Sequence, residues 1–391
     1  MYATALLSLV LLQLIGCERI FTHGIIPIKA SNALTSLSTI LSCLSLMEIA
    51  MNGNGLPQRF HKWRAFAMSR HLLYMAIAMF CINCLFGCAR QTDSAAERVI
   101  FVAKNNIGEK KLYIMNLDGR GPNELHWGGF EQISKLPAWS TDGKRAVAYL
   151  DRNDASGLYI SDDETKVPRL VLSDEDLPRG ITLNGSSYPI LSPDGSALAF
   201  LGFGDSGAEV FIANIAGTSV TQLTRNEFSE EHLSWSPDGK RLVFASALKD
   251  MGGYLMNDIF VIGADGSGIV QLTNNASANL DPSWSPDGKR IVFTRDRDIY
   301  VLELDTMNET RLTDDGLDMR PVWSPAGDRI AFISLRDSEC DGITIADGVQ
   351  FCTTAIYFMD ADGSNSVLWL KDNKQIVDIA WLPLAGSVDQ P

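Results

Sequence analysis

Residues 280–293 read LDPSWSPDGKRIVF, a pattern that predicts two strands joined by a tight turn. Pro286 presets φ for the first corner of a type I turn, Asp287 suits the next position, and Gly288 takes the positive φ that closes it. Ser285 can bond back to the turn amides. The β-prone, apolar residues on either side alternate as a half-buried strand requires. The pattern therefore predicts a β-hairpin.

Close copies of this hairpin recur along the chain, each with an aromatic or aliphatic residue directly before the turn. Successive copies lie 39 to 58 residues apart, the scale of a four-stranded propeller blade of about 40 to 50 residues. We call the six residues before the turns the anchors: Trp139, Leu191, Trp235, Trp284, Trp323 and, in a worn copy, Trp381. Because their spacing follows the repeat, we expect the anchor tryptophans in the core between blades.

The residues between copies follow a constant order of four strands, here called A to D. Strand A carries the anchor, strand B follows the tight turn, and strands C and D complete the blade. After Trp284, strands B, C and D are expected at 290–294, 298–302 and 311–313.

The two ends of the repeat region complement each other. The segments 98–104, 111–119 and 131–135 have the patterns of B, C and D strands without an A strand, and the A strand at Trp381 has no strand after it. Joining them would leave no open sheet edge. We predict an all-β fold, a six-bladed β-propeller of four-stranded antiparallel blades over residues 98–384, closed by pairing of its N- and C-terminal strands and followed by a tail at 385–391.

With their SPDG turns and tryptophan anchors, these repeats resemble those of the TolB propeller family over about three quarters of the chain. The resemblance implies a propeller fold, and for function it implies a partner-binding role in the cell envelope. One fold hosts many activities, so the resemblance constrains the fold far more than the function.

Charge is distributed unevenly along the chain. Residues 1–87 contain six basic and two acidic side chains, which leaves residues 88–391 with a formal charge of −18. Such a field repels phosphate backbones and anionic lipid heads. The composition therefore argues against nucleic acid as a partner and limits membrane contact to a lipid anchor.

Residues 68–88, MSRHLLYMAIAMFCINCLFGC, have the layout of a signal peptide, with a basic start and about fifteen apolar residues. The ending Leu85–Cys88 resembles the lipobox of bacterial lipoproteins, whose cysteine is lipidated and becomes the first residue of the mature protein. We expect lipidation at Cys88 and export to the periplasm or cell surface, on the outer membrane if the host is Gram-negative.

Around this signal we expect translation to begin at Met68, residues 1–67 to be a mis-annotated extension, and residues 89–97 to be a linker. Two alternatives stay open: residues 68–88 as an uncleaved membrane anchor, and the lipobox-like run that ends at Cys17 as the lipidation site.

Cys340 and Cys352 both lie in the long B–C insertion 335–354, which we expect to lack ladder partners. A link between them would close a loop of about a dozen residues and contribute roughly 3 kcal/mol in the chain-entropy estimate. Free thiols are liabilities in an oxidising compartment. We therefore predict a disulfide between the two cysteines.

The direction of the strands predicts where a ligand would bind. The A–B and C–D turns are tight and share one face, whereas the variable B–C and D–A loops share the other. On that second face, at the mouth of the central channel, we expect a ring of the residues three positions before each anchor, with Glu231 close by. The ring comprises Leu136, Tyr188, His232, Asp281, Arg320 and Asp378.

Two interpretations of this ring lead to two functions. Carboxylates and a histidine could hold a divalent cation for a metal-assisted lyase or hydrolase, with Asp281, Asp378, His232 and Glu231 as ligands and catalytic groups. Otherwise the ring is a polar rim with internal ion pairs such as Arg320 with Asp378. The sequence contains no G-x-S-x-G, H-E-x-x-H or P-loop motif. We favour a monomeric, non-enzymatic scaffold of the cell envelope that binds a protein or glycan, and apart from a possible channel cation we expect no cofactor.

Overall fold

The computed structural model describes residues 98–382 except for short gaps at 106–107, 118–121, 127–134, 153–154, 163–166, 251–254, 276 and 345–349. The predicted extension, signal peptide, Cys88 and linker lie outside the described residues, as does the predicted tail at 385–391. Among the described residues, no helix has the length and apolar character needed to cross a bilayer.

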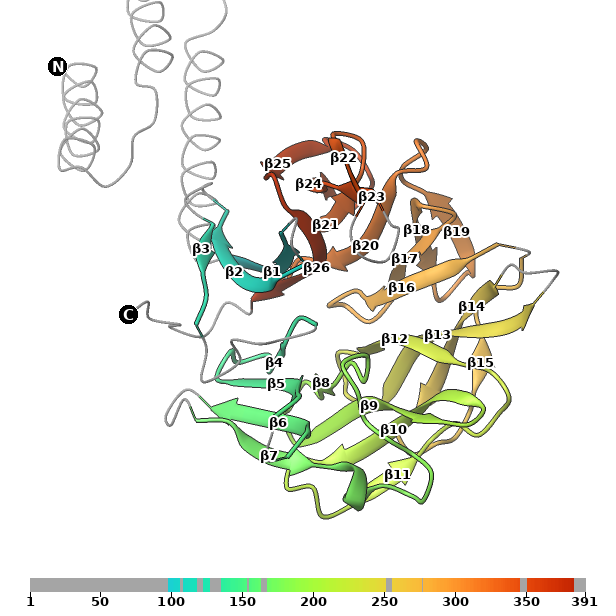
Figure 1. The fold of residues 1–391 in the computed structure, drawn as a ribbon. Coiled ribbons are helices and arrows are strands. Elements are labelled where there is room, and N and C mark those ends of the chain that lie inside the picture. The colour runs from blue at the N-terminus through green and yellow to red at the C-terminus, as the bar shows by residue number, and fades with distance from the viewer. Residues whose placement is uncertain are drawn as a thin grey trace, which may run out of the picture. The chain divides into compact units, whose positions relative to one another are not determined.

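Within the described part of the chain, six four-stranded antiparallel sheets are arranged around a common axis, each with its A strand innermost (Figure 1). This arrangement confirms the six-bladed propeller. From the axis outward, the first three sheets are β4 (Ala138–Trp139), β5 (Arg145–Leu150), β6 (Gly157–Asp162) and β7 (Arg169–Leu172); β8 (Ile190–Leu191), β9 (Ala197–Gly204), β10 (Gly207–Asn214) and β11 (Val220–Gln222); and β12 (Glu230–Trp235), β13 (Arg241–Asp250), β14 (Leu255–Gly263) and β15 (Val270–Gln271).

The remaining sheets follow the same plan. They are β16 (Asn279–Trp284), β17 (Arg290–Arg295), β18 (Asp298–Glu303) and β19 (Asn308–Arg311); β20 (Asp318–Trp323), β21 (Arg329–Ser334), β24 (Ala355–Asp360) and β25 (Val367–Lys371); and β26 (Gln375–Leu382), β1 (Arg98–Lys104), β2 (Lys110–Asn116) and β3 (Asn123–Glu124). A short 3-10 helix, η3 (Asp174–Asp176), lies between β7 and β8.

The last strand closes the ring. β26 pairs with β1 from Arg98↔Leu382 to Lys104↔Gln375, so the two ends of the repeat region share one sheet, as predicted. The prediction for the fourth strand of this blade was wrong. Its fourth strand is β3, paired through Tyr113↔Glu124, and not the segment 131–135. Residues 131–134 lie outside the described part of the chain.

The tight turn has the predicted chemistry. Gly288 has φ +71°, the Gly288 amide donates to the Ser285 carbonyl at 2.9 Å, and the Arg290 amide donates to Ser285 Oγ at 2.9 Å. The positive φ explains the glycine, since other residues adopt this conformation at a cost.

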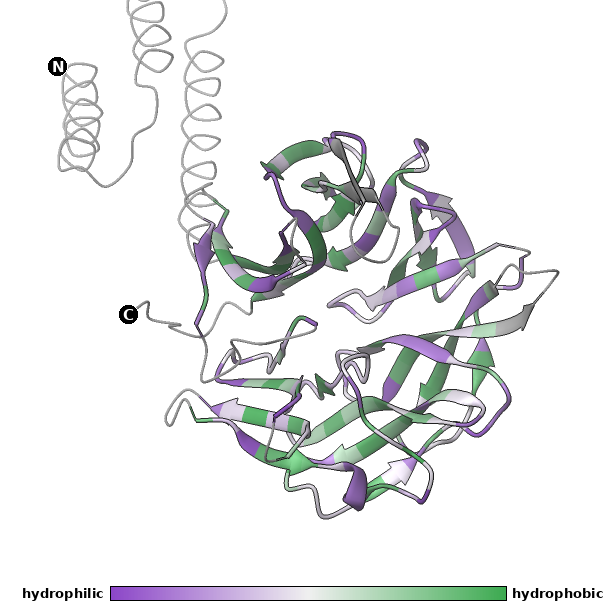
Figure 2. Ribbon diagram, in the orientation of Figure 1, coloured by the Kyte–Doolittle hydropathy of each residue, from purple (hydrophilic) through white to green (hydrophobic). Residues whose placement is uncertain are grey.

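The hydrophobic core lies between neighbouring blades. Trp284 packs with Val243 and Ile259 of the preceding blade, and Trp323 likewise packs with Val292. This confirms the anchors as core residues. Figure 2 shows the apolar residues gathered on the middle strands, while the outer strands are more polar.

The B–C insertion departs from the prediction. We expected residues 335–354 to lack ladder partners, but β22 (Cys340–Thr344) and β23 (Gln350–Cys352) pair as a separate two-stranded sheet. The expectation was wrong because the insertion folds back and pairs with itself instead of with the blade.

Candidate binding site at the propeller axis

Backbone hydrogen bonds define the two faces of the propeller. On one face the C–D turn contacts the A–B turn of the same blade, where the Ala264 amide donates to the Lys240 carbonyl at 2.8 Å. On the other, D–A and B–C loops meet, where the Leu335 amide donates to the Leu317 carbonyl at 2.9 Å. The loops therefore share a face, as the strand directions predict.

Four residues near the axis on the loop face have an unusual backbone. Tyr188, His232, Asp281 and Arg320 each lie three residues before an anchor, with φ between 42° and 54°. In β12, β16 and β20 the pairing with the B strand is interrupted at this point by a register shift. Positive φ is uncommon in residues other than glycine and is strained for bulky ones such as tyrosine. Each residue thus occupies the same irregularity, repeated from blade to blade.

Arg320 links three of the other predicted residues. Its Nη1 donates to Asp378 Oδ1 at 3.1 Å and lies 3.4 Å from the Tyr188 hydroxyl, and its backbone N–H donates to Asp281 Oδ2 at 3.3 Å. The nearby Asp378 and Asp281 carboxylates outweigh burial and raise the pKa of Arg320, so the guanidinium is charged. The structure therefore brings together side chains from four blades.

His232, another predicted residue of the ring, contacts Asp281 and Tyr188. Its Nε2 lies 3.2 Å from Asp281 Oδ1, and its ring meets that of Tyr188 edge-on at 5.3 Å. Burial lowers the pKa of His232 despite the neighbouring Asp281. Burial opposes ionisation of Asp281, but His232, Arg320 and two hydrogen bonds lower its pKa overall. Glu231 lies at the edge of the ring, where its Oε2 is 3.7 Å from His232 Nδ1.

Lys135 contacts Tyr188 at the place in the ring where the sequence predicted Leu136. Its Nζ donates to the Tyr188 hydroxyl at 2.5 Å and lies 4.5 Å from the centroid of the Tyr188 ring. Leu136 instead packs against apolar residues of the core, including Leu112 and Ala146. The prediction for Leu136 was therefore wrong. The sequence signal that could have identified Lys135 is its position directly before Leu136, the residue three positions before Trp139.

Lys135 is also electrostatically distinct. Burial and then the charge of Arg320 lower its pKa, and burial raises the pKa of Tyr188 to about 12. Within the described part of the chain, Lys135 makes no ion pair. We call Lys135, Tyr188, His232, Asp281, Arg320 and Asp378 the axial cluster.

The axial cluster does not fit a divalent cation. Asp378 is bound by Arg320, and Asp281 is bound by both Arg320 and His232. Lys135 and Arg320 add positive charge where a metal would lie. Across the described residues, no group of three or more acidic, histidine or cysteine side chains is placed to hold a metal.

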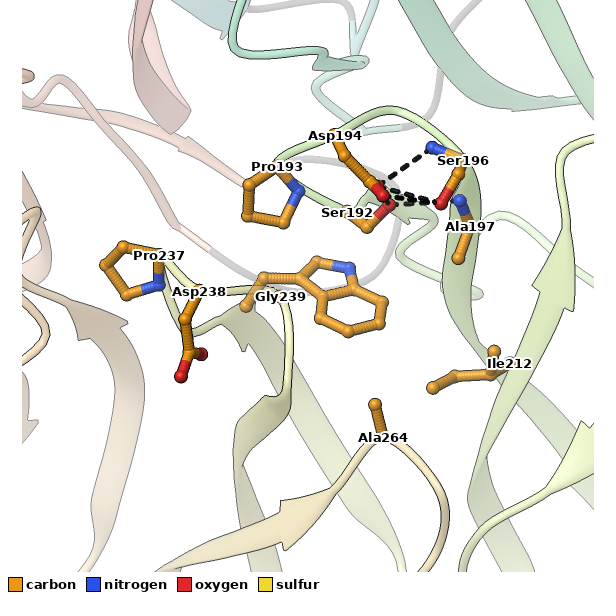
Figure 3. Close-up of a pocket in the computed structure, with 11 residues that line it drawn as sticks. Ser192, Pro193, Asp194, Ser196, Ala197, Ile212, Pro237, Asp238, Gly239 and Ala264 are labelled. Carbon is orange, nitrogen blue, oxygen red and sulfur yellow. Dashed lines mark hydrogen bonds between the residues drawn. The ribbon is translucent and has the colours of Figure 1, made fainter.

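A separate pocket of about 320 Å³ opens beside two A–B turns (Figure 3). Trp235 and Ile212 contribute apolar lining, and Asp194 is bonded to Ser192 and Ser196 of its own turn. The polar groups of this turn are thus occupied with holding its shape.

The cysteines of the insertion meet across their hairpin. β22 and β23 place Cys340 opposite Cys352 in register, and Cys352 is disulfide-bonded in the structure. This register is what the predicted disulfide requires.

Comparisons with known proteins bear on the family. The model of the TolB beta propeller domain matches residues 92–249 and again 159–346. An uncharacterized peptidase, YuxL of Bacillus subtilis (strain 168), is 27% identical over 193 residues, which cover 39% of this chain and 28% of that protein. This chain therefore spans less than a third of that relative's length.

Two solved structures share the fold. The crystal structure of TolB from Acinetobacter baumannii superposes with a TM-score of 0.56 at 21% identity and covers 74% of this chain and 67% of that chain. A chain of the nidogen/laminin complex superposes with a TM-score of 0.51 at 10% identity, covering 73% of this chain and 98% of that chain. At these identities the likeness shows the fold alone.

Proposed function

This chain belongs to the TolB beta propeller domain family, and from that premise we propose that it is a non-enzymatic binding protein of the cell envelope whose axial cluster and loop face hold a protein or glycan partner.

The repeated backbone irregularity carries this proposal. Glycine would adopt a positive φ without strain, yet the four positions hold tyrosine, histidine, aspartate and arginine. Strained backbone persists where the surrounding structure enforces it, and it concentrates at functional sites. Four such residues on one face favour a function for their side chains.

The chemistry of the cluster favours binding over catalysis. Arg320 and His232 are engaged with the two aspartates, so the acids and bases hold one another in fixed positions. Lys135 contributes a cation that donates its hydrogen bond to the neutral Tyr188 hydroxyl, which leaves it able to receive a carboxylate or hydroxyl from a binding partner. Phe228, a partly exposed aromatic side chain in the D–A loop before β12, adds apolar contact area on the same face.

Export and lipid anchoring through Cys88 are part of the same proposal. They rest on the signal-like segment 68–88 and on the resemblance to lipoproteins, and they place the loop face where envelope partners occur. A disulfide between Cys340 and Cys352 agrees with an oxidising compartment. The expected monomeric state is likewise a proposal.

Site-specific photo-crosslinking in intact envelopes tests the binding face. A photoreactive residue at Glu231, on the loop face, should give a discrete adduct, and one at Lys289, on the tight-turn face, should not. The adduct at Glu231 should weaken in a Lys135→Met background that melts like the wild type. Equal adducts from both positions, or none from Glu231, would contradict the proposed face.

A further inference from the structure

Three successive blade junctions place the same pair of polar positions in the core. One is the acidic residue of strand C: Glu209, Asp258 and Asp298. The other begins the next A strand: Glu230, Asn279 and Asp318. The residue after each acid donates its backbone N–H to a threonine two residues after strand D, at 2.8 to 2.9 Å in all three cases. These shared bonds show that the junctions are equivalent.

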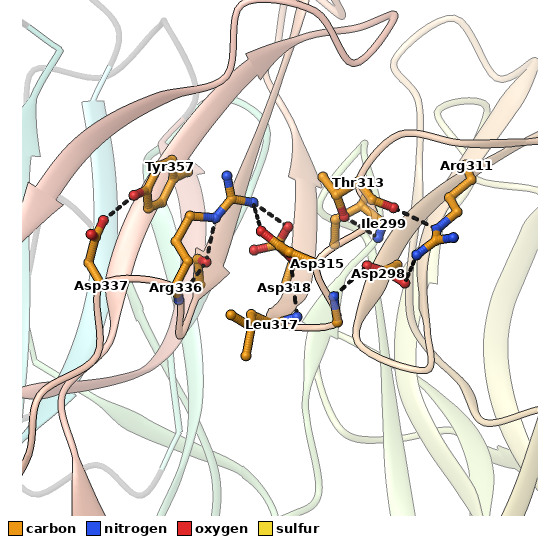
Figure 4. A network of polar contacts seen from close by, with 12 residues as sticks. Asp298, Ile299, Arg311, Thr313, Asp315, Leu317, Asp318, Arg336, Asp337 and Tyr357 are labelled. Atoms are coloured by element: carbon orange, nitrogen blue, oxygen red, sulfur yellow. Dashed lines mark hydrogen bonds and ion pairs between the residues drawn. The ribbon is translucent and has the colours of Figure 1, made fainter.

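At the last of these junctions the acids are balanced by arginines (Figure 4). Arg311 Nη2 lies 2.7 Å from Asp298 Oδ2, and Arg336 pairs with Asp318. Two buried carboxylates thus face two guanidinium groups.

At the middle junction an uncharged asparagine replaces one of the two acids. Asn279 stands where the other junctions have an acid, and its Nδ2 donates to Asp258 Oδ1 at 3.1 Å. Thr273 Oγ1 and Gln271 Nε2 donate to the same carboxylate. A single acid with three donors is well satisfied.

The first junction has two acids, with neither arginine partners nor an asparagine in place of one acid. Glu209 and Glu230 are 5% and 1% exposed, and no described lysine, arginine or histidine forms an ion pair with either. Asn226 holds both, through its backbone N–H to Glu209 Oε1 at 2.9 Å and its Nδ2 to Glu230 Oε1 at 2.8 Å. Glu209 Oε2 is buried, and none of the residues that the structure describes donates a hydrogen bond to it. Burying carboxylates without a counter-charge is costly.

We propose that Glu209 and Glu230 bind a divalent cation, Ca²⁺, between these two blades, with the hydroxyls of Thr224 and Ser246 as neighbouring ligands. Each hydroxyl lies 3.4 Å from an oxygen of Glu230. That is longer than the usual O–H···O distance of about 2.7–2.8 Å. It matches the separation of roughly 3.4 Å between adjacent oxygens that each lie about 2.4 Å from one Ca²⁺ ion.

The oxygen-only ligand set selects the metal class, because carboxylates and hydroxyls suit hard cations. A proton is the competing counter-charge, since burial and the charge of Glu209 raise the pKa of Glu230 to about 7. Glu230 begins β12, two residues before His232. The bound ion would therefore fix the strand that carries part of the axial cluster.

Thermal unfolding of the purified full-length chain tests this site. After treatment with EDTA, 1 mM CaCl₂ at pH 8 and constant ionic strength should raise the wild-type melting temperature by several degrees. The isosteric variants Glu209→Gln and Glu230→Gln should lose that response. Asp298→Asn, at the equivalent junction with arginines, is the matched control and should keep it. Equilibrium dialysis with ⁴⁵Ca²⁺ should give one ion per wild-type chain and none for either glutamine variant.

Two results would overturn the proposal. One is an equal response to Ca²⁺ in the wild type and both glutamine variants, which would assign the effect to surface carboxylates. The other is absence of ⁴⁵Ca²⁺ binding to the wild type together with stabilisation of the wild type, but not of Glu230→Gln, as the pH falls through about 7. A proton would then be the counter-charge. Absence of ⁴⁵Ca²⁺ binding to the wild type would overturn the proposal even if a variant fails to fold.

Discussion

Removal of the closing strand should unfold the whole propeller. In a variant that lacks residues 376–391, β1 loses its partner along β26, and the ring opens at the blade that joins both ends of the domain. A tail that merely covers the surface could be removed without this effect.

The size of the loss follows from the side chains that β26 buries. Ile376, Ile379 and Leu382 are at most 3% exposed. Burial of an isoleucine or leucine contributes about 1.5–3 kcal/mol, so the three contribute roughly 5–9 kcal/mol before Trp381 and the ladder to β1 are counted. The free energy of unfolding of a domain is about 5–15 kcal/mol. The deletion therefore removes most or all of the net stability.

Circular dichroism melting and limited proteolysis of the full-length and truncated chains measure this effect. We expect no cooperative transition in the truncated protein and digestion throughout residues 98–375. A control that lacks only residues 385–391 leaves β26 whole and should melt like the wild type. A chain without residues 376–391 that melts cooperatively at the wild-type temperature would refute ring closure as a source of stability.

Three further predictions concern other parts of the chain. Mass spectrometry of the non-reduced, digested protein should find the peptides of Cys340 and Cys352 joined, and alkylation of both without reductant would contradict the bridge. Radioactive palmitate should label the wild type and not Cys88→Ser, and label that persists in the variant would place the anchor elsewhere. Asp281→Asn should lose about 1–3 kcal/mol at pH 7, because it removes a hydrogen-bonded buried charge. Since the folded-state pKa of Asp281 is lowered, its contribution is complete above the unfolded value of about 3.9 and is lost as the pH falls through the folded value. The difference between the urea midpoints of the wild type and the variant should therefore be smaller at pH 3 than at pH 7. An equal difference at both pH values would contradict this assignment.

The fold and most of the axial cluster could be predicted because the tight turn fixes a register. Each SPDG turn places its anchor at the end of strand A, and the residue three positions earlier then falls at the irregularity near the axis. Counting back from Trp284 and Trp323 thus finds Asp281 and Arg320. Leu136 fails the rule although β4 (Ala138–Trp139) is no shorter than β8 (Ile190–Leu191), because its apolar side chain packs in the core against Leu112 and Ala146 instead.

Other features depend on contacts that no local pattern encodes. Glu209 and Glu230 lie on different blades, and only the packing of β10 against β12 brings them near the same asparagine. Their significance comes from comparison with Asp298 and Asp318, whose arginines are visible as partners only once the chain is folded. The pairing of β22 with β23 was missed for a related reason, since the insertion lacks a tight-turn signature like that of the blades.

The position of β1 also determines how the propeller would bear a mechanical load. Seven register pairs connect β1 to β2 and seven connect it to β26. Tension that reaches the domain through the chain before Arg98 pulls β1 along its own axis, so both ladders are loaded in shear and must rupture together. Forced unfolding depends on the rate of that rupture rather than on equilibrium stability. If the protein is tethered through the chain before Arg98, the propeller that carries the loop face is therefore held by the two ladders of β1, which resist a pulling force together.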